Sequence, residues 1–416
     1  MLLQLTLSSR EDFHAKYHDL ILSAASSWKR VEAFLDGRRV PVQQVAELEA
    51  RWAMVVLYSR GEPVELSGSG AEVEVSARFA SEGVIDPSSW LRIAVSGDRF
   101  KVTTDHFSSI PSFVASGEVV GLVQWPKAFR SQTAVRLPPH AMVEVAEGAF
   151  SSVVGLDQRA SGEVEATPEG LLRALESSVM RNAGSRCAVS LSGGLDSSLL
   201  LKLATESSRR VIALTVGVRG SDDLVRAKRV ASVLGVDHVA HELNDEEVVQ
   251  AASYVKRVMG LERPMDISLA AILHLCASLA RSHSFSQLLV GQGADELFGG
   301  YAKYPEALKR GGVSALRAAM SRDLEELRSN GLVRDYVSAA LGGATLTLPY
   351  LSPEVLSVAQ NLPIHRKVSG HERKVVLREV ARIASVPEEA WRADKKAAQY
   401  STGVEKVVRR WLRRTL

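Results

Sequence analysis

Nine residues near the middle of the chain separate a short apolar run from an apolar segment of helical composition: Ser190-Leu191-Ser192-Gly193-Gly194-Leu195-Asp196-Ser197-Ser198. The apolar run occupies residues 187–189, and the helical segment occupies residues 199–204. A strand that stops at two glycines and continues as a helix is typical of phosphate sites. Glycine lets backbone N–H groups approach an anion, and the helix N-terminus adds positive potential. The loop therefore predicts a strand–loop–helix unit that binds phosphate.

The side chains of this loop make the prediction more specific. The loop has no lysine after its glycines, so it is not a Walker A motif. Ser192 and Ser197 offer hydroxyl donors, whereas Asp196 would repel a bare phosphate. The carboxylate is compatible with phosphate if it holds a metal ion that the phosphate also binds. An ordinary turn is the alternative for a single Gly-Gly pair, but the length and setting of this loop favour the metal-assisted site.

Composition limits the other classes of function. The chain has 416 residues, 46% of them hydrophobic, which is enough for about two domains with large cores. A net charge of +3 does not favour a nucleic-acid partner, and the basic cluster from Arg392 onward is typical of a solvated helix face. The two cysteines, Cys187 and Cys276, have no metal-binding spacing. With no signal segment and no apolar run of membrane-spanning length, we expect a cytoplasmic protein without a membrane partner.

The pattern changes at about residue 160. Residues 1–160 contain short apolar or alternating runs, such as 91–95 and 142–145, separated by turn-forming residues. They predict a β-rich α+β domain, and the polar stretch 158–168 predicts a linker.

Residues 161–416 form the second predicted domain. Strand-like runs at 188–191, 211–216 and 288–290 alternate with helical segments at 171–182, 197–208, 222–235, 245–259 and 268–282. This alternation predicts an α/β domain with a mostly parallel sheet and helices on both faces, followed by a helical part from about residue 305.

A second glycine-rich loop follows the predicted strand at 288–290: Gly291-Gln292-Gly293-Ala294-Asp295-Glu296-Leu297-Phe298-Gly299-Gly300-Tyr301. Ligands of open parallel sheets bind at the carboxyl ends of the strands, where both glycine-rich loops fall. We therefore expect Asp196 and Asp295 to lie on either side of one Mg²⁺ ion that also binds phosphate.

The first loop resembles that of ATP enzymes that release pyrophosphate, a superfamily that one motif cannot subdivide. Further segments resemble the asparagine synthetase family, and they occur in the order of that family. These segments are 192–198, 215–223, 227–238, 262–264, 291–301, 374–379 and 392–396. The resemblance implies that ATP and Mg²⁺ are the cofactors.

The resemblance also implies roles for individual residues. It assigns Asp196 and Asp295 to the metal, and Leu214 and Val216 to the adenine pocket. The residues implied to bind ATP or its pyrophosphate are Leu191, Ser192, Gly193, Gly194, Asp196, Ser197, Leu214, Val216, Gly291, Gly293 and Lys395.

Three residues are candidates for the chemistry. Lys374 resembles the lysine that stabilises charge on the α-phosphate as pyrophosphate leaves, and a solvated helix lysine is the alternative. Glu262 is a candidate for accepting a proton from the incoming amine, and an exposed glutamate at a helix end is the alternative. Gln292 can hydrogen-bond an intermediate but cannot act as a base.

The chain departs from the family around its substrate and in its first domain. The family has Glu, or Tyr in β-lactam synthetases, at the position of Gln292. Its charged residues near a Pro-Phe-Leu-Asp string are replaced by the neutral segment 345–352, so the identity of the carboxylate stays open. Segments 104–111 and 137–140 resemble a glutaminase domain, but Leu2 stands where its nucleophilic cysteine would be.

We therefore expect residues 1–160 to be a degenerate glutaminase-like domain without activity, and residues 161–416 to be an AMP-forming amide ligase. Ammonia or an amine would attack an adenylated small carboxylate, as in asparagine synthesis. Amidation or cyclisation of another carboxylate and a non-catalytic ATP-binding scaffold are the alternatives. A separate glutaminase subunit and a homodimer both stay open.

Overall fold

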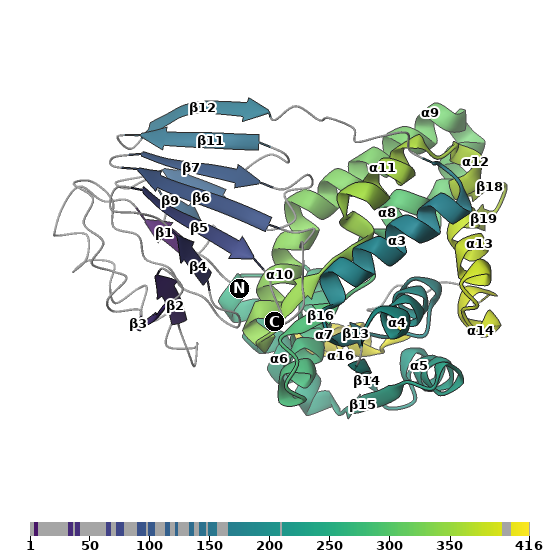
Figure 1. The fold of residues 1–416 in the computed structure, drawn as a ribbon. Coiled ribbons are helices and arrows are strands. Elements are labelled where there is room, and N and C mark those ends of the chain that lie inside the picture. The colour runs from purple at the N-terminus through teal and green to yellow at the C-terminus, as the bar shows by residue number, and fades with distance from the viewer. Residues whose placement is uncertain are drawn as a thin grey trace. The chain divides into compact units, whose positions relative to one another are not determined.

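The computed structural model describes a set of strands between Gln4 and Gly155, and then residues 165–208, 210–392 and 401–415. These elements fall into two compact units, with the boundary between strand β12 (Ala149–Gly155) and helix α3 (Pro168–Ala183) (Figure 1). Each unit has its own sheets.

The N-terminal unit contains two sheets. The larger has the strand order β12-β11-β7-β6-β5-β4-β2-β3, and the smaller has the order β1-β9-β8-β10. Their strands are β1 (Gln4–Thr6), β2 (Glu32–Leu35), β3 (Arg38–Pro41), β4 (Val64–Ser67), β5 (Glu72–Arg78), β6 (Trp90–Ser96), β7 (Arg99–Thr104), β8 (Phe113–Ser116), β9 (Gly121–Val123), β10 (Thr133–Arg136) and β11 (Ala141–Ala146), besides β12. Residues 105–111 and 137–140, which carry most of the glutaminase resemblance, lie outside the described residues. The class of this domain stays a prediction.

The C-terminal unit is built on a five-stranded sheet with the order β15-β14-β13-β16-β17, in which every neighbouring pair is parallel. The strands are β13 (Arg186–Ser190), β14 (Arg210–Val218), β15 (Asp237–Leu243), β16 (Gln287–Leu289) and β17 (Thr345–Thr347). The predicted α/β class is confirmed for this unit. The sequence did not predict the two edge strands, β15 and β17.

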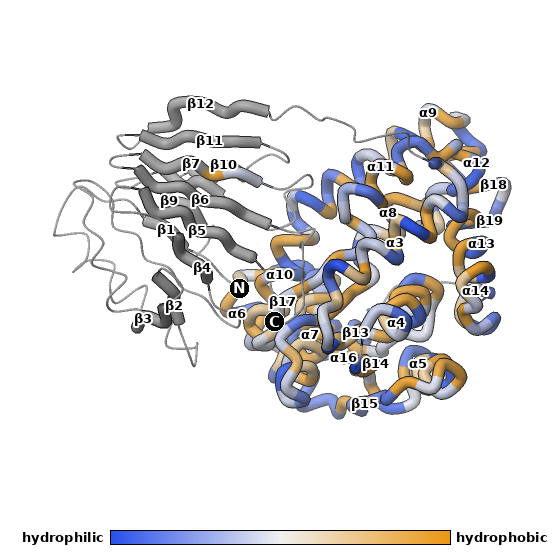
Figure 2. Tube along the Cα trace, in the orientation of Figure 1, coloured by the Kyte–Doolittle hydropathy of each residue, from blue (hydrophilic) through white to orange (hydrophobic). Residues whose placement is uncertain are grey.

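Helices cover both faces of this sheet (Figure 1). Helices α4 (Leu195–Ser207) and α5 (Asp222–Leu234) pack against β13, β14 and β15. Helix α7 (Pro264–Ser282) packs against β14 and β16, and α10 (Leu332–Gly342) packs against α7 and β17. Figure 2 shows hydrophobic and hydrophilic residues alternating along these helices. This pattern is expected because each helix packs its hydrophobic side against the sheet or a neighbouring helix.

The remaining helices complete the unit. They are α6 (Asp245–Met259), α8 (Ala294–Phe298), α9 (Lys303–Glu326), the π-helical turn Leu327–Gly331, the 3-10 turn η3 (Pro349–Leu351), α11 (Pro353–Asn361), α12 (Ile364–Lys367), α13 (Val375–Ile383), α14 (Glu388–Arg392) and α16 (Val404–Thr415). A short hairpin, β18 (Val368–Ser369) and β19 (Glu372–Arg373), leads into α13. Helix α7 is long and apolar enough to span a membrane, but its contacts with β14, β16 and α10 are those of a core helix.

The order of the strands places a topological switch point in the middle of the sheet. From β13 the chain continues to β14 and β15 on one side, and it later returns to add β16 and β17 on the other side. Loops that leave the carboxyl ends of β13 and β16 therefore diverge, and such a switch point is where open α/β sheets bind ligands. Both glycine-rich loops begin there.

The loop after β13 fits closely against helix α5. Gly193 has a left-handed backbone, with a φ angle of 70°, and a Cβ atom there would lie 2.5 Å from the carbonyl carbon of Arg226. The obstacle is main chain, so no side-chain rotation can relieve it. Gly235, which ends α5, has a similar φ of 65° but nothing within 4 Å of its Cβ position.

These two glycines give a matched test of the loop packing. Gly235→Ala should lower the free energy of unfolding by about 1 kcal/mol, the cost of the left-handed conformation alone. Gly193→Ala adds a backbone clash and should cost about 3 kcal/mol or more. Urea denaturation measures both. Equal losses for the two variants would contradict the packing of the loop on α5.

Candidate functional site

A buried lysine lies between the two aspartates at the switch point. Lys374 Nζ lies 2.6 Å from Oδ1 and 2.5 Å from Oδ2 of Asp196, and 2.7 Å from Oδ1 of Asp295. The lysine is 4% exposed. One ammonium group between two carboxylates leaves this cluster with a formal charge of −1.

The three side chains come from three separate segments. Asp196 lies in the first turn of α4, Asp295 in the first turn of α8, and Lys374 caps the N-terminus of α13. Lys374 has a left-handed backbone, with φ 55° and ψ 38°, which is uncommon for a residue with a Cβ atom and often marks a functional position.

Gly300 makes room for the cluster. A Cβ atom on Gly300 would lie 1.7 Å from Oδ1 of Asp295 and 2.3 Å from Cε of Lys374. Its N–H also donates to the main-chain carbonyl of Asp295 at 2.9 Å. No residue other than glycine can therefore occupy this position while Asp295 and Lys374 keep their places.

The two carboxylates suit a divalent cation. Lys374 Nζ is within 2.7 Å of both, so a single cation can reach both aspartates at once. Across the described part of the chain, no group of three or more His, Cys, Asp or Glu side chains could hold a metal ion. Mg²⁺ is commonly held by one or two carboxylates, with phosphate oxygens and waters as its other ligands. Asp196 and Asp295 fit that pattern.

The loop after β13 is ordered by its own hydroxyl groups. Ser192 Oγ and Ser197 Oγ lie 3.1 Å apart, and the N–H of Ser192 donates to Ser197 Oγ at 3.2 Å. Gly194 caps the N-terminus of α4 without a side chain to accept its first N–H groups. The loop therefore presents both hydroxyl and main-chain donors beside Asp196, as an anion site requires.

The residues expected to line an adenine pocket lie on β14. Leu214 and Val216 are both buried, and the carbonyl of Leu214 accepts the N–H of Leu191 at 2.8 Å. Between them, the hydroxyl of Thr215 donates to the carbonyl of Leu191 at 2.6 Å. These bonds join the start of the first loop to β14.

Of the remaining predicted site residues, only some lie near Asp196, Asp295 and Lys374. Gly291, half-buried Gln292 and Gly293 lie in the loop after β16, and a Cβ atom on Gly291 would be 3.1 Å from Cβ of Asp196. Glu262 is exposed in the turn between α6 and α7, and no hydrogen bond or ion pair in the described part of the chain joins it to the cluster. Lys395 lies outside the described residues.

Tyr350 supports the cluster from its main-chain side, although the sequence did not indicate it. Its side chain is fully buried, and its hydroxyl donates to the main-chain carbonyl of Asp196 at 3.1 Å. Burial and the nearby carboxylates of Asp196 and Asp295 raise the pKa of Tyr350 well above its usual value, so the phenol stays a neutral donor. The sequence signal that could have identified Tyr350 was its position in the segment 345–352, where the chain departs from the family.

The segment that contains Tyr350 is neutral and buried. Thr345, Thr347 and Ser352 are at most 6% exposed, and they occupy the strand and turn beside the loop after β16. The N–H of Val290 donates to the carbonyl of Thr347 at 3.1 Å, which holds this segment next to the second glycine loop. The segment 345–352 therefore brings no formal charge to this side of the cluster.

Known proteins resemble the chain over this unit. The sequence profile of the asparagine synthase family matches residues 170–337 and 309–416. A putative glutamine-hydrolysing asparagine synthetase of Methanocaldococcus jannaschii is 30% identical over 278 residues, which cover 59% of this chain and 51% of that protein. Asparagine synthetase B of Escherichia coli is 27% identical over 252 residues, covering 56% of this chain and 44% of that protein.

The matches cover about half of these relatives' lengths or less. Among solved structures, the NMN synthetase of Francisella tularensis aligns with a TM-score of 0.25 and 13% identity over 50% of this chain and 96% of that one, too low a likeness to support an argument. The family profile covers more than half of the chain, including all three residues of the Lys374 cluster. The chain belongs to the asparagine synthase family, whose members are ATP-dependent amide ligases.

Proposed function

We propose that the chain is a magnesium-dependent, AMP-forming amide ligase. A substrate carboxylate attacks the α-phosphate of ATP, and pyrophosphate leaves. Ammonia or an amine then attacks the acyl carbon, which gives an amide, AMP and a proton. The observation that supports this proposal is the cluster of Asp196, Asp295 and Lys374 at the switch point, beside the N-terminus of α4, which has no side-chain cap.

Each part of the cluster has a role in this reaction. Asp196 and Asp295 would hold Mg²⁺, which supplies charge neutralisation for the pyrophosphate. The hydroxyl and N–H groups of the loop after β13 would bind the pyrophosphate. Lys374 brings a cation to the cluster, and its ammonium would stabilise the charge that grows on the α-phosphate as the bond to pyrophosphate breaks. Tyr350 holds the main chain of Asp196 in place.

We assign the substrate to the side of the cluster formed by the loop after β16 and the segment 345–352. Besides Asp295 and Glu296, that side offers the amide of Gln292 and the hydroxyls of threonine and serine. Aspartate, which carries an ammonium and two carboxylates, would find no positively charged partner for its second carboxylate among residues 291–301 and 345–352. A less polar carboxylate suits them better, and amidation or cyclisation of such an acid is the second candidate.

Free ammonia, or ammonia from a separate glutaminase, is the nitrogen source we propose. Both cysteines of the chain, Cys187 and Cys276, are buried in the C-terminal unit. Burial raises the pKa of the Cys276 thiol to about 11 and also raises that of Cys187, so neither is a thiolate at neutral pH. The chain therefore offers no reactive thiol for glutamine hydrolysis. A cytoplasmic setting would supply the ATP.

ATP–pyrophosphate exchange tests the adenylation step. With Mg²⁺ and the correct acid, the chain should exchange labelled pyrophosphate into ATP before any amine is added. Aspartate and a panel of less polar acids would be screened. Asp295→Asn should reduce exchange about 100-fold, because a metal clamp contributes several kcal/mol to the transition state. Nucleotide binding without exchange for any acid would favour the scaffold alternative.

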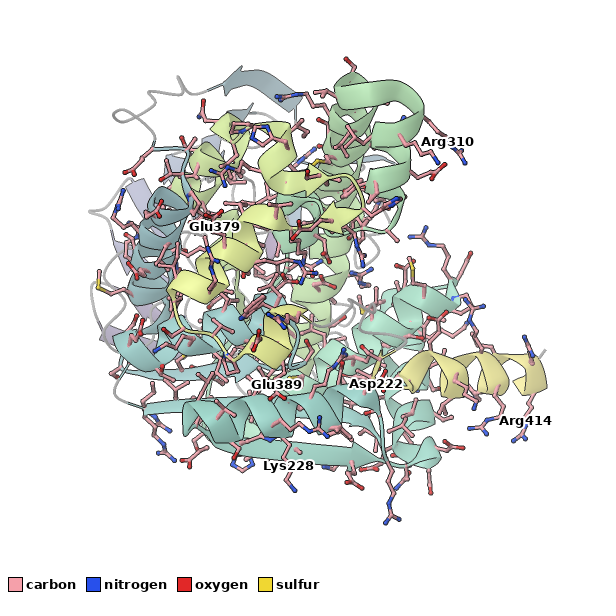
Figure 3. All side chains as sticks on the ribbon, turned by 90° about the vertical axis from the view of Figure 1, so that its right-hand side faces the viewer. Asp222, Lys228, Arg310, Glu379, Glu389 and Arg414 are labelled. Carbon is pink, nitrogen blue, oxygen red and sulfur yellow. The ribbon has the colours of Figure 1, made fainter. Side chains whose placement is uncertain are left out.

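Replacing Lys374 tests its role in catalysis. Lys374→Ala should lower the exchange rate by about 100- to 1000-fold, the usual effect of losing one preorganised donor to a developing negative charge. Lys228→Ala removes an exposed lysine on α5 and serves as the control (Figure 3). Equal exchange rates for the two variants would contradict a role for Lys374 at the α-phosphate.

The nitrogen source is tested with the same acid. Amide formation should depend on added ammonium or amine, and glutamine alone should give neither amide nor glutamate. Mass spectrometry of the products distinguishes the two sources. Product formed from glutamine by the purified chain would overturn the proposed lack of glutaminase activity.

A further inference from the structure

The proposed function uses only the first residue of the segment Lys374-Val375-Val376-Leu377-Arg378-Glu379. We propose that Arg378 is a positioning residue, which holds the backbone of Lys374 in the conformation that directs Nζ between Asp196 and Asp295. The proposal rests on the function proposed above only for the role of Lys374. Arg378 itself touches neither carboxylate in the structure.

The guanidinium of Arg378 donates hydrogen bonds to main-chain carbonyl groups. Its Nε donates to the carbonyl of Arg373 at 3.0 Å, and its Nη1 donates to the carbonyl of Trp391. The backbone N–H of Arg378 also donates to the carbonyl of Lys374 at 3.0 Å. Arg378 thus bonds the carbonyl groups on both sides of the Lys374 Cα atom, and it ties them to α14.

The carbonyl of Arg373 belongs to the peptide group that precedes the Lys374 Cα atom. The direction of this carbonyl is therefore coupled to the φ angle of Lys374. That angle is 55°, a left-handed value that is unfavourable for a residue with a Cβ atom. Without the bond from Arg378, this peptide group loses one of the contacts that fix its direction, and Lys374 can relax by rotation toward a negative φ. Such a rotation redirects the side chain away from the carboxylates.

Arg373 fixes the same peptide segment from the other side. Its Nη1 donates to the carbonyl of Gly300 at 3.0 Å. Gly300 is the residue whose Cβ position is filled by Asp295 and Lys374. The backbone that precedes Lys374 is therefore held at two points. The Arg373 side chain bonds the carbonyl of Gly300, and the Arg378 side chain bonds the carbonyl of Arg373.

The other charged residues of α13 do not share this arrangement. Glu379 pairs with Arg366 at 2.9 Å, which joins α13 to α12. Helices α13 and α14 pack against each other, and Glu379 and Glu389 mark them in Figure 3. Arg382 lies one turn after Arg378 on α13 and is exposed. It therefore provides a control of the same residue type on the same helix.

The experiment compares Arg378→Gln, Arg378→Lys and the control Arg382→Gln in the full chain. Exchange rates and the affinity for MgATP, measured by calorimetry, are the readouts. Arg378→Gln should lower the maximal exchange rate about 10- to 100-fold, with a smaller change in the KM for the acid. Arg378→Lys should recover part of the rate, because an ammonium can reach one carbonyl but not span both. Arg382→Gln should match the wild type.

A double-mutant cycle separates positioning from a general loss of structure. In a Lys374→Gln background, Arg378→Gln should change MgATP affinity and residual exchange less than twofold, since the residue that it positions is gone. If the two substitutions act additively, or if Arg378→Gln behaves as Arg382→Gln does, the proposal is overturned. If Arg378→Gln does not fold, the cycle is repeated with Arg378→Lys in its place.

The same cycle distinguishes this proposal from the proposed function. Absence of exchange in the wild type, with every acid tried, would contradict the ligase activity. MgATP affinity does not depend on turnover, so non-additive effects on it would still support the positioning role of Arg378, and additive effects would still overturn it.

Discussion

The ammonium group of Lys374 between two carboxylates is the interaction on which the rest of the site depends. Two aspartates at the ends of neighbouring strands repel each other unless a cation lies between them. Lys374 supplies that cation from a third segment, and it reaches them only because Gly300 has no side chain and because Lys374 adopts a left-handed backbone. The glycine loops, the hairpin before α13 and the turn that carries Tyr350 all support this contact.

Much of the architecture follows from local sequence. Strands β13, β14 and β16 are apolar runs bounded by glycine or polar residues, and the rule that ligands bind at carboxyl strand ends was enough to pair Asp196 with Asp295. The edge strands β15 and β17 escaped prediction for different reasons. β15 has one buried residue among exposed and half-buried ones, as suits an edge, and β17 is three residues long within a largely helical region.

The residues missed at the site act through the tertiary fold. Tyr350 bonds a main-chain carbonyl 154 residues away, and no local pattern encodes such a pairing. Arg378 was within a recognised segment, but its bonds to two backbone carbonyl groups depend on how α13 meets α14. Lys374 was identified by resemblance, whereas its left-handed backbone and its contact with both aspartates needed the structure. For Glu262, the sequence left a catalytic role and an exposed helix-end position open, and the structure shows it exposed.

The order of the strands has a consequence for synthesis of the protein. Asp196 and Lys374 are 178 residues apart in the sequence. The central strand β13 lies between β14 and β16, so its pairing is complete only after β16 has been synthesised. Contacts of such long sequence separation form late, because the intervening chain must first be ordered. On the ribosome, a nascent chain that has emerged through α8 would carry both aspartates without their lysine. The cluster of two carboxylates and one ammonium would therefore form only after Lys374 has been translated.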